Sequence, residues 1–382
     1  MNPLPALSLD WDIFCAVIDN YGDAGVCWRL ARQLVAEHGQ AVRLWIDRPE
    51  VLACLLPALA PGRDRQTVQG VEVRHWVGGL EGERPARVVV EAFACHVPDA
   101  FQVALRERGS LWVNLEYFSA EDWVEGCHGL PSLQAGGARK FFFFPGMTAA
   151  TGGLLRERDL IARRDAFVSD ASLRRAWCAC RGLPFPEAGE RAVSLFAYEQ
   201  PAMPALLQSL ARAPQPGLLY VPQGRVLSSL NAVLPGGCPA PGQTCTLGAL
   251  GRLRVHVLPF LPQEDYDALL WLCELNLVRG EDSLVRALWA GKPFLWQIYP
   301  TEDEAHRLKL EAFVARYTAL APEGAVGEWA EAMRAWNGQG VLAPEAVEAL
   351  FIHPAWFRHA SEALIREEDL ATRLTKFVFD RV

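Results

Sequence analysis

The fold is decided by residues 13–46, which read IFCAVIDNYGDAGVCWRLARQLVAEHGQAVRLWI. Ile13–Ile18 is a short apolar run with β-branched and aromatic residues, which predicts a buried strand. Turn-forming residues follow at Asp19–Gly25, and Val26–His38 then carries apolar residues at helical spacing. Val42–Ile46 predicts the next strand. A strand, loop, helix and strand in this order predict the start of a doubly wound α/β sheet.

The same alternation continues through the rest of the chain. In the first half, strands are predicted at Val71–Trp76, Val88–Ala92, Leu111–Leu115 and Lys140–Phe144, of which Phe141–Phe144 is expected to be fully buried and central. A single helix is predicted at Ala162–Cys180. In the second half, strands are predicted at Ala192–Tyr198, Leu218–Val221, Val255–Leu258, Leu275–Val278 and Phe294–Ile298, with helices at Ala205–Ala211, Gln263–Cys273 and Asp282–Ala290.

A break in this pattern divides the chain. Residues 184–190 are rich in Pro, Gly and Glu and are interpreted as a linker. Residues 1–183 then form an N-terminal Rossmann-like domain, and residues 191–354 form a C-terminal one. Residues 355–382 have an amphipathic helical pattern and are expected to pack back on the N-terminal domain.

Composition limits the classes of partner. The chain has 382 residues, of which 51% are hydrophobic and 21% charged, as in globular proteins of about two domains. The formal net charge of −8 disfavours nucleic acid, which binds basic surfaces. No apolar stretch approaches the roughly 18 uncharged residues of a membrane span, and Met1–Asp12 lacks the basic residues of a signal peptide. We therefore expect a cytosolic protein that binds neither nucleic acid nor membranes.

The spacing of potential ligands predicts no metal site. The ten cysteines are scattered without a C-x-x-C pair and are expected to be buried free thiols, with a disulfide or metal framework as the alternative. The eight histidines show no spacing typical of metal ligands. Asp10 and Asp12 form a D-x-D sequence, but they precede the first predicted strand and are interpreted as a solvated lead-in.

The loop after the first strand contains Asp19, Asn20, Tyr21, Gly22 and Asp23. Ligands of open α/β sheets bind at the carboxyl ends of the strands, which is where this loop is predicted to lie. The loop lacks the G-x-G-x-x-G sequence of dinucleotide sites, and it places two carboxylates at the crevice. An ordinary turn in which Asp23 caps the helix is the alternative interpretation.

A second loop of this kind contains Arg279, Gly280, Glu281, Asp282 and Ser283. It lies between a predicted strand and a predicted helix, so that backbone N–H groups at the helix start favour an anion such as a diphosphate. Arg279 can add charge-assisted hydrogen bonds, while the two acids are expected to face sugar hydroxyls or a cationic acceptor. A capping turn with solvated charges is the alternative.

Aromatic and amide side chains lie at two other strand ends of the second half. Phe196 and Tyr198 follow one strand, and Phe260 and Gln263 follow another. A pyrimidine base needs a stacking surface and a hydrogen-bonding partner for its edge, which these residue types supply. Phe196 and Phe260 suit a hydrophobic core equally well.

Four blocks of sequence resemble one known family. The chain is similar to the protein-arginine rhamnosyltransferases of bacterial elongation factor P, the EarP family, from about Ile13 to the C-terminal tail. The blocks that carry the resemblance are Asp19–Asp23 with Gly25–Leu34, Ser194–Glu199, Arg279–Ser283 and Phe294–Pro300.

This resemblance implies more than the residues do by themselves. It implies a GT-B fold with two domains facing a central cleft, and a metal-independent, inverting transfer from dTDP-β-L-rhamnose to one arginine of elongation factor P. The thymine would lie near Phe260 and Gln263, while Tyr198 and the Arg279–Ser283 loop would hold the diphosphate and the sugar. Asp23 matches the general base of the family.

Asp19 and Glu281 are expected to assist Asp23 by orienting the acceptor arginine. The residues alone support sugar-nucleotide chemistry, but they identify neither rhamnose as the sugar nor arginine as the acceptor. Another sugar-nucleotide transferase or epimerase, or a non-catalytic module that binds a translation factor, therefore remains an alternative from the residues.

Overall fold

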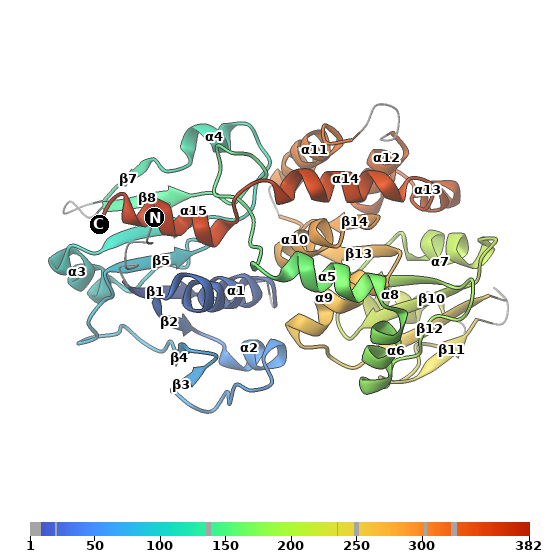
Figure 1. The fold of residues 1–382 in the computed structure, drawn as a ribbon, viewed down its shortest axis with the longest axis horizontal. Coiled ribbons are helices and arrows are strands. Elements are labelled where there is room, and N and C mark those ends of the chain that lie inside the picture. The colour runs from blue at the N-terminus through green and yellow to red at the C-terminus, as the bar shows by residue number, and fades with distance from the viewer. Residues whose placement is uncertain are drawn as a thin grey trace. The chain divides into compact units, whose positions relative to one another are not determined.

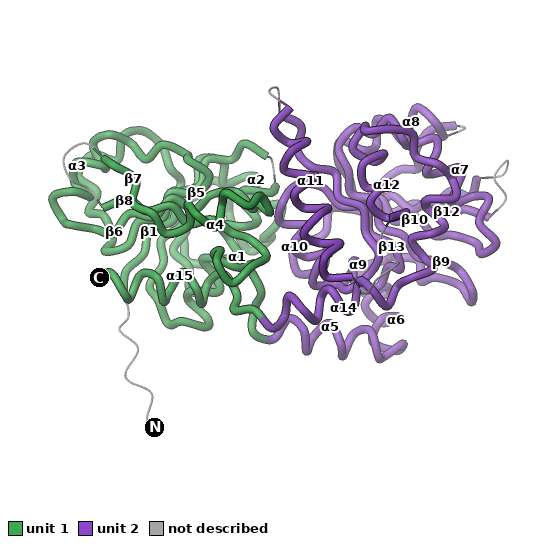
Figure 2. The backbone as a smooth tube through the Cα atoms, turned by 90° about the horizontal axis from the view of Figure 1, so that it is seen from above, with its two compact units in different colours: residues 1–158, 367–382 green, residues 159–366 purple. Residues whose placement is uncertain are grey.

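The chain folds into two compact units, each built around one sheet of mostly parallel strands (Figure 1). The computed structural model describes residues 9–19, 21–134, 139–234, 236–247, 252–301, 304–321 and 327–382. Unit 1 comprises Met1–Arg158 and Glu367–Val382, and unit 2 comprises Asp159–Arg366 (Figure 2). Among the described residues, no helix is both long enough and apolar enough to cross a membrane.

The sheet of unit 1 has eight strands within the described residues. In spatial order they are β3 (Arg65–Val68), β4 (Val71–His75), β2 (Ala41–Ile46), β1 (Asp10–Cys15), β5 (Val88–Ala92), β6 (Leu111–Leu115), β8 (Arg139–Phe143) and β7 (Pro131–Leu133). The strands from β4 to β8 pair in parallel, and β3 and β7 add antiparallel edges. The helices of the unit are α1 (Tyr21–His38), α2 (Pro49–Leu55), α3 (Asp99–Arg108), α4 (Trp123–Cys127) and α15 (Leu370–Phe379).

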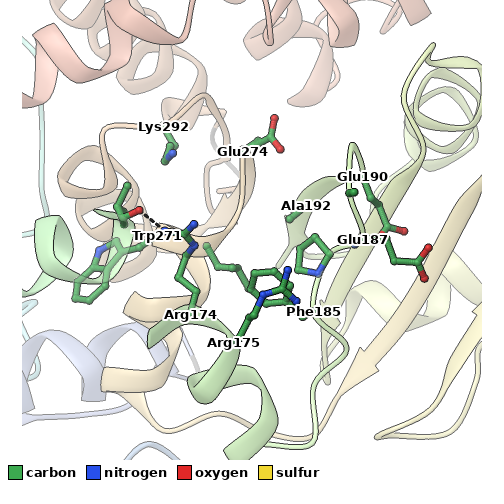
Figure 3. A pocket seen from close by; sticks show the side chains of 13 residues that line it. Arg174, Arg175, Phe185, Glu187, Glu190, Ala192, Trp271, Glu274 and Lys292 are labelled. Carbon is green, nitrogen blue, oxygen red and sulfur yellow. Dashed lines mark hydrogen bonds between the residues drawn. The ribbon is translucent and has the colours of Figure 1, made fainter. Parts of the chain in front are cut away.

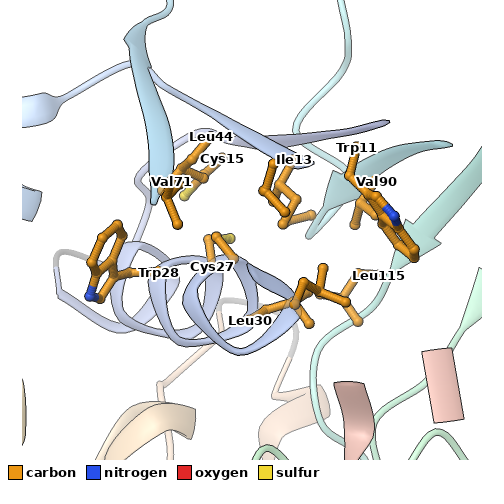
Figure 4. Close-up of a cluster of buried hydrophobic side chains, with 14 of the residues drawn as sticks. Trp11, Ile13, Cys15, Cys27, Trp28, Leu30, Leu44, Val71, Val90 and Leu115 are labelled. Carbon is orange, nitrogen blue, oxygen red and sulfur yellow. The ribbon is translucent and has the colours of Figure 1, made fainter. Parts of the chain in front are cut away.

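Alternating side chains of β1 fill a core on each face of this sheet. Ile13 and Cys15 pack with Cys27 and Leu30 of α1 in the larger cluster (Figure 4). Phe14 points to the opposite face, where it packs in a second cluster with residues of α3. Fully burying a side chain of this size contributes about 1.5–3 kcal/mol. Burial on both faces holds β1 centrally and fixes the position of the loop that follows it.

Asp12 corrects the interpretation of the D-x-D sequence as a solvated lead-in. It lies in β1 and is 0% exposed. Arg43 Nε and Nη2 donate to its two oxygens over 2.6 and 2.7 Å, and Trp45 Nε1 and Ala86 N donate over 2.8 and 2.7 Å. The carboxylate is therefore a satisfied part of the core, because a bidentate arginine offsets the cost of its burial.

The strand predicted from the phenylalanine run lies near an edge of the sheet. β8 pairs with β6 on one side and with the three-residue strand β7 on the other. Phe141 and Phe142 are half-buried and only Phe143 is fully buried in this strand. The expectation of a fully buried central strand was wrong, because an apolar run carries no information about its place in the sheet.

The sheet of unit 2 repeats the parallel arrangement. Its spatial order within the described residues is β11 (Thr244–Thr246), β12 (Leu253–Leu258), β10 (Gly217–Pro222), β9 (Arg191–Leu195), β13 (Leu275–Arg279) and β14 (Phe294–Gln297), of which β11 is antiparallel. Its helices are α5 (Leu160–Ser169), α6 (Ala171–Cys180), α7 (Met203–Arg212), α8 (Val226–Val233), α9 (Gln263–Leu272), α10 (Gly280–Ala290), α11 (Ala305–Thr318), α12 (Gly327–Trp336), α13 (Pro344–Ala349) and α14 (Pro354–Ile365).

The boundary between the two units does not fall at residues 184–190, where the sequence predicts a linker. The first crossing falls at Arg158, because α5 packs against α9 and so belongs to unit 2. The predicted helix over residues 162–180 is two helices, because the Asp170 side chain accepts from Ser172 N and Leu173 N and starts α6. The tail is also divided: α14 packs against α10, and α15 returns to α1 of unit 1.

Candidate active site

Asp23 is the most enclosed carboxylate of the predicted loop in unit 1. It lies in the first turn of α1 and is 2% exposed. Its Oδ2 accepts hydrogen bonds from Ile18 N and Asp19 N, both over 2.8 Å. These donors lie upstream of the helix, so Asp23 ties the loop to the helix and is not its N-cap. Burial raises the pKa of Asp23, and these backbone donors act in the opposite direction.

Tyr117 is a partner of Asp23 that the sequence reasoning missed. Its hydroxyl donates to Asp23 Oδ1 over 3.2 Å, and its ring stacks on Phe93 with the centroids 4.3 Å apart. Phe93, Ala94 and His96 follow β5 and all have positive φ, at 57°, 51° and 54°. Such strain in residues other than glycine is typical of functional loops. Tyr117 could have been found from its place just after a predicted strand.

The other residues of this loop lie close to Asp23. Gly22 N donates to Asp19 O over 2.7 Å, which closes a turn. A Cβ atom on Gly22 would lie 2.9 Å from Asp19 Oδ2, so a side chain at this position would displace the Asp19 carboxylate. Tyr21 packs against the core of the unit. The predicted site residue Asn20 lies outside the described residues.

Arg279 occupies the carboxyl end of β13 in unit 2, between two aromatic rings. Its guanidinium carbon is 4.5 Å from the ring centre of Phe196 and 4.4 Å from that of Tyr198. The residue is 5% exposed, and its Nη1 has no hydrogen-bond acceptor within the described chain. A buried donor without an acceptor costs free energy. The arrangement therefore suits an anionic ligand that supplies the acceptor.

The start of α10 holds Arg279 in place. Ser283 Oγ accepts from Arg279 N over 3.1 Å and donates to Arg279 O. Trp296 Nε1 donates to Gly280 O over 2.7 Å, and Gly280 has φ +62°, which glycine adopts without strain. The Ser283 hydroxyl thus shapes the turn, while the amino-terminal N–H groups of the helix provide partial positive charge next to Arg279.

The two acids of this loop are each held by a neighbour. Lys309 Nζ lies 2.8 Å from Glu281 Oε1 in an ion pair, and Gln263 Nε2 donates to Asp282 Oδ2 over 3.2 Å. The pairing with Lys309 offsets the Glu281 charge and lessens its repulsion of an anion at Arg279. Phe260 is half-buried in the loop between β12 and α9, at the same edge of the sheet.

Gln297 and Arg225 also contact the Tyr198 segment and were missed as site residues. Gln297 Oε1 accepts from Tyr198 N over 2.8 Å, and Gln297 Nε2 donates to Glu199 O over 3.2 Å. Arg225 lies 5.6 Å from the Tyr198 ring centre and pairs with Glu199 at 2.7 Å. Gln297 is a polar residue at the end of a predicted strand, and this position could have identified it as a candidate site residue. Arg225 has no such signal.

Comparison with known proteins identifies the family. Residues 11–379 match the family model described as elongation-factor P (EF-P) rhamnosyltransferase EarP. The chain belongs to the EarP family.

Individual relatives agree with this assignment. A protein-arginine rhamnosyltransferase of Pseudomonas aeruginosa is 50% identical over 97% of this chain and 99% of its own length. A solved structure described as the basis for EarP-mediated arginine glycosylation of translation elongation factor EF-P is 37% identical, with a TM-score of 0.68 over 98% of this chain and 100% of the other.

The fold is shared more widely than the family. The Phytolacca americana UGT2 structure has a TM-score of 0.52 at 11% identity and covers 98% of this chain and 99% of its own. The EarP chain thus has the GT-B glycosyltransferase fold that the resemblance implies.

Proposed function

We propose that this EarP-family glycosyltransferase moves L-rhamnose from dTDP-β-L-rhamnose to an arginine side chain of elongation factor P, in the cytosol. The observation that carries the proposal is the buried Arg279 guanidinium, which has an unused donor at the carboxyl edge of the unit 2 sheet. Membership of the EarP family supports the choice of rhamnose and of elongation factor P.

The donor would bind to unit 2. Arg279 and the amino-terminal N–H groups of α10 would hold the diphosphate, because Arg279 Nη1 has no acceptor within the described chain and the start of the helix carries partial positive charge. Phe260 and Gln263 would bind the thymine, through a ring surface and an amide. Tyr198 would lie beside the sugar, since Gln297 and Arg279 fix its backbone and its ring.

Asp23 would take the proton of the acceptor nitrogen. A free guanidinium has a pKa above about 12 and an ordinary aspartate one near 4, so deprotonation before attack is unfavourable by roughly 8 pKa units. Attack and proton transfer are therefore concerted. The nitrogen–C1 bond forms as the bond from C1 to the dTDP oxygen breaks, and the acidified nitrogen passes its proton to Asp23.

The remaining acids would orient the acceptor. Asp19 and Glu281 would bind the guanidinium and localise its charge, and Lys309 would offset the charge of Glu281 until the acceptor arrives. Attack from the face opposite dTDP inverts C1. Arg279 and α10 would stabilise the charge that develops on the departing diphosphate, so the proposed reaction uses no divalent metal.

Mass spectrometry of elongation factor P tests the proposal directly. Incubation with the protein and dTDP-β-L-rhamnose should add the mass of one rhamnosyl group, localised to one arginine by fragmentation. An acceptor with that arginine changed to lysine should stay unmodified, and a chelator should not alter the rate. Transfer from another sugar nucleotide at a higher kcat/KM, or activity restored only by a divalent ion, would contradict the corresponding part of the proposal.

A further inference from the structure

Unit 2 has a polar pocket at the amino-terminal ends of the strands of its sheet. The pocket has a volume of about 350 Å³, and Figure 3 shows Arg174, Arg175 and Phe185 along one side, with Lys292 and Glu274 on another. Glu274 immediately precedes β13 and Lys292 precedes β14, so the pocket lies at the amino-terminal ends of the parallel strands. Arg279 lies at the carboxyl ends, which separates the pocket from the candidate active site.

The pocket carries more positive charge than its lining first suggests. Arg174, Arg175 and Lys292 line it together with three glutamates. Glu190 is bound by Arg254, whose Nε donates to Glu190 Oε1 over 2.7 Å, and Glu187 lies 3.5 Å from the same guanidinium. Glu274 is then the one acid of the described lining without an arginine partner. One arginine offsets the charge of only one of its two glutamates, so Arg174, Arg175 and Lys292 face two uncompensated acids, and this small excess of positive charge suits a small anion.

Lys292 differs from the other lysines of the chain, which are Lys140, Lys309 and Lys376. Lys140 pairs with Glu91 at 2.7 Å, Lys309 pairs with Glu281 at 2.8 Å, and Lys376 pairs with Glu368. The half-buried Lys292 ammonium has no hydrogen bond or ion pair with any other described residue. It is thus the one lysine of the four whose amine is not held by a carboxylate.

The surroundings of Lys292 make its ammonium group easier to deprotonate. Burial lowers the pKa of Lys292, and the neighbouring Arg358 and Arg174 lower it further, while Glu274 and Cys273 act in the opposite direction. A lysine becomes a nucleophile when burial and nearby cations destabilise its ammonium form. Arg174 and Arg175 of the pocket lining can bind a phosphate group.

We propose that Lys292 is a modification site at which the amine is acylated by a small acyl phosphate. The Nζ lone pair attacks the acyl carbon, and the bond from that carbon to the phosphate oxygen breaks. Phosphate leaves with the electron pair, stabilised by Arg174 and Arg175, and the amide nitrogen releases its proton to water. The product is a neutral amide in place of a cation.

Acetyl phosphate is the probe that tests this inference. The full-length protein is incubated with it, digested with a protease that does not cut at lysine, and the acetyl occupancy of all four lysines is followed over time. Lys292 should react at least about fivefold faster than any of the three paired lysines, a factor equivalent to about 1 kcal/mol at 1.36 kcal/mol per tenfold in rate. Equal or slower labelling of Lys292 would overturn the proposal.

A neutral reagent separates anion binding from general reactivity. Arg175 lies with its guanidinium carbon 4.2 Å from the centre of the Phe185 ring and is exposed, so Arg175→Gln should leave the fold intact. This variant should lower the preference for Lys292 with acetyl phosphate and leave it unchanged with the N-hydroxysuccinimidyl ester of acetic acid. Arg212→Gln, at an exposed position outside the pocket, is the matched control. If Arg175→Gln changes neither preference, the pocket does not direct the acyl phosphate.

Discussion

Asp23 in unit 1 and Arg279 in unit 2 are both buried charges at the carboxyl edge of a parallel sheet, but their partners differ. Asp23 accepts from Ile18 N, Asp19 N and Tyr117 Oη. Arg279 lies between aromatic rings and keeps one nitrogen without an acceptor in the described chain. A group that transfers a proton gains from being held in position, whereas a group that binds a ligand needs unused hydrogen-bonding capacity.

The difference between these sites predicts which kinetic constant each mutation changes. Loss of the Asp23 carboxylate should affect the chemical step, since the protein itself supplies its hydrogen bonds. Loss of the Arg279 guanidinium should affect donor binding, because the ligand would supply the missing acceptor. The predictions that follow run from the largest expected effect to the smallest.

Asp23→Asn should lower kcat by about 10²-fold or more, because the amide accepts the loop hydrogen bonds but takes no proton. Donor affinity should stay near that of the parent protein. Single-turnover transfer with saturating acceptor, beside a dTDP-rhamnose titration, measures both. Asp64→Asn is the control, since its side chain is 98% exposed. A near-normal transfer rate in Asp23→Asn would place the base elsewhere.

Arg279→Ala should weaken dTDP binding by about 10–150-fold, the factor for a lost charge-assisted hydrogen bond of roughly 1.5–3 kcal/mol. Once the donor is saturating, kcat should fall by less than the affinity does. Calorimetric titration with dTDP measures the first effect, and the exposed Arg212→Ala serves as a control. Unchanged affinity in a folded Arg279→Ala protein would remove Arg279 from the donor site.

Tyr117→Phe should slow transfer by about 2–10-fold, the effect of one neutral hydrogen bond, and it should also change the pH profile. Burial raises the pKa of Asp23 and the Tyr117 hydroxyl lowers it. The reaction needs the ionised carboxylate, so the rate rises with pH through the pKa of Asp23. Removing the hydroxyl raises this pKa and should move the acidic limb to higher pH. If the variant is slower but the acidic limb of its pH–rate profile stays at the same pH, Tyr117 acts only in packing.

Arg225→Ala should have the smallest effect. Arg225 and its partner Glu199 are 55% and 52% exposed in their side chains, and such surface pairs contribute no more than about 1 kcal/mol. Donor affinity should therefore fall by at most about fivefold, and less at high salt, because screening already weakens the pair. A loss as large as that of Arg279→Ala would show that Arg225 contacts the donor directly.

Strand ends were the most useful signal for the candidate site. Loops that follow β1, β9, β12 and β13 in the chain could be found from apolar runs, and parallel pairing brings such loops to one edge of each sheet. Tyr117 and Gln297 obey the same rule but were not selected, because single polar residues after a strand are common. The partners Lys309 and Arg225 come from elements whose packing has no local signature in the sequence.

The boundaries between the units were harder to predict from the sequence than the strands were. The predicted bounds of Val88–Ala92 and Leu111–Leu115 match β5 and β6. The segment over residues 159–180 was assigned to the first domain because helical periodicity does not say which sheet a helix covers. Its place in unit 2 depends on contacts between α5 and α9, which are remote in sequence.

The sequence by itself determined the order of strands and helices, the loops that carry Asp23 and Arg279, and membership of the EarP family. Local hydrophobic periodicity and turn residues are sufficient for this, because they act over a few neighbours. The tertiary structure decided the state of each charge: Asp12 buried against Arg43, Asp23 held by Tyr117, Glu281 paired with Lys309, and Lys292 near Glu274 but outside any ion pair of the described residues. Those states depend on desolvation and on partners that are distant in the chain, so that only the folded protein can define them.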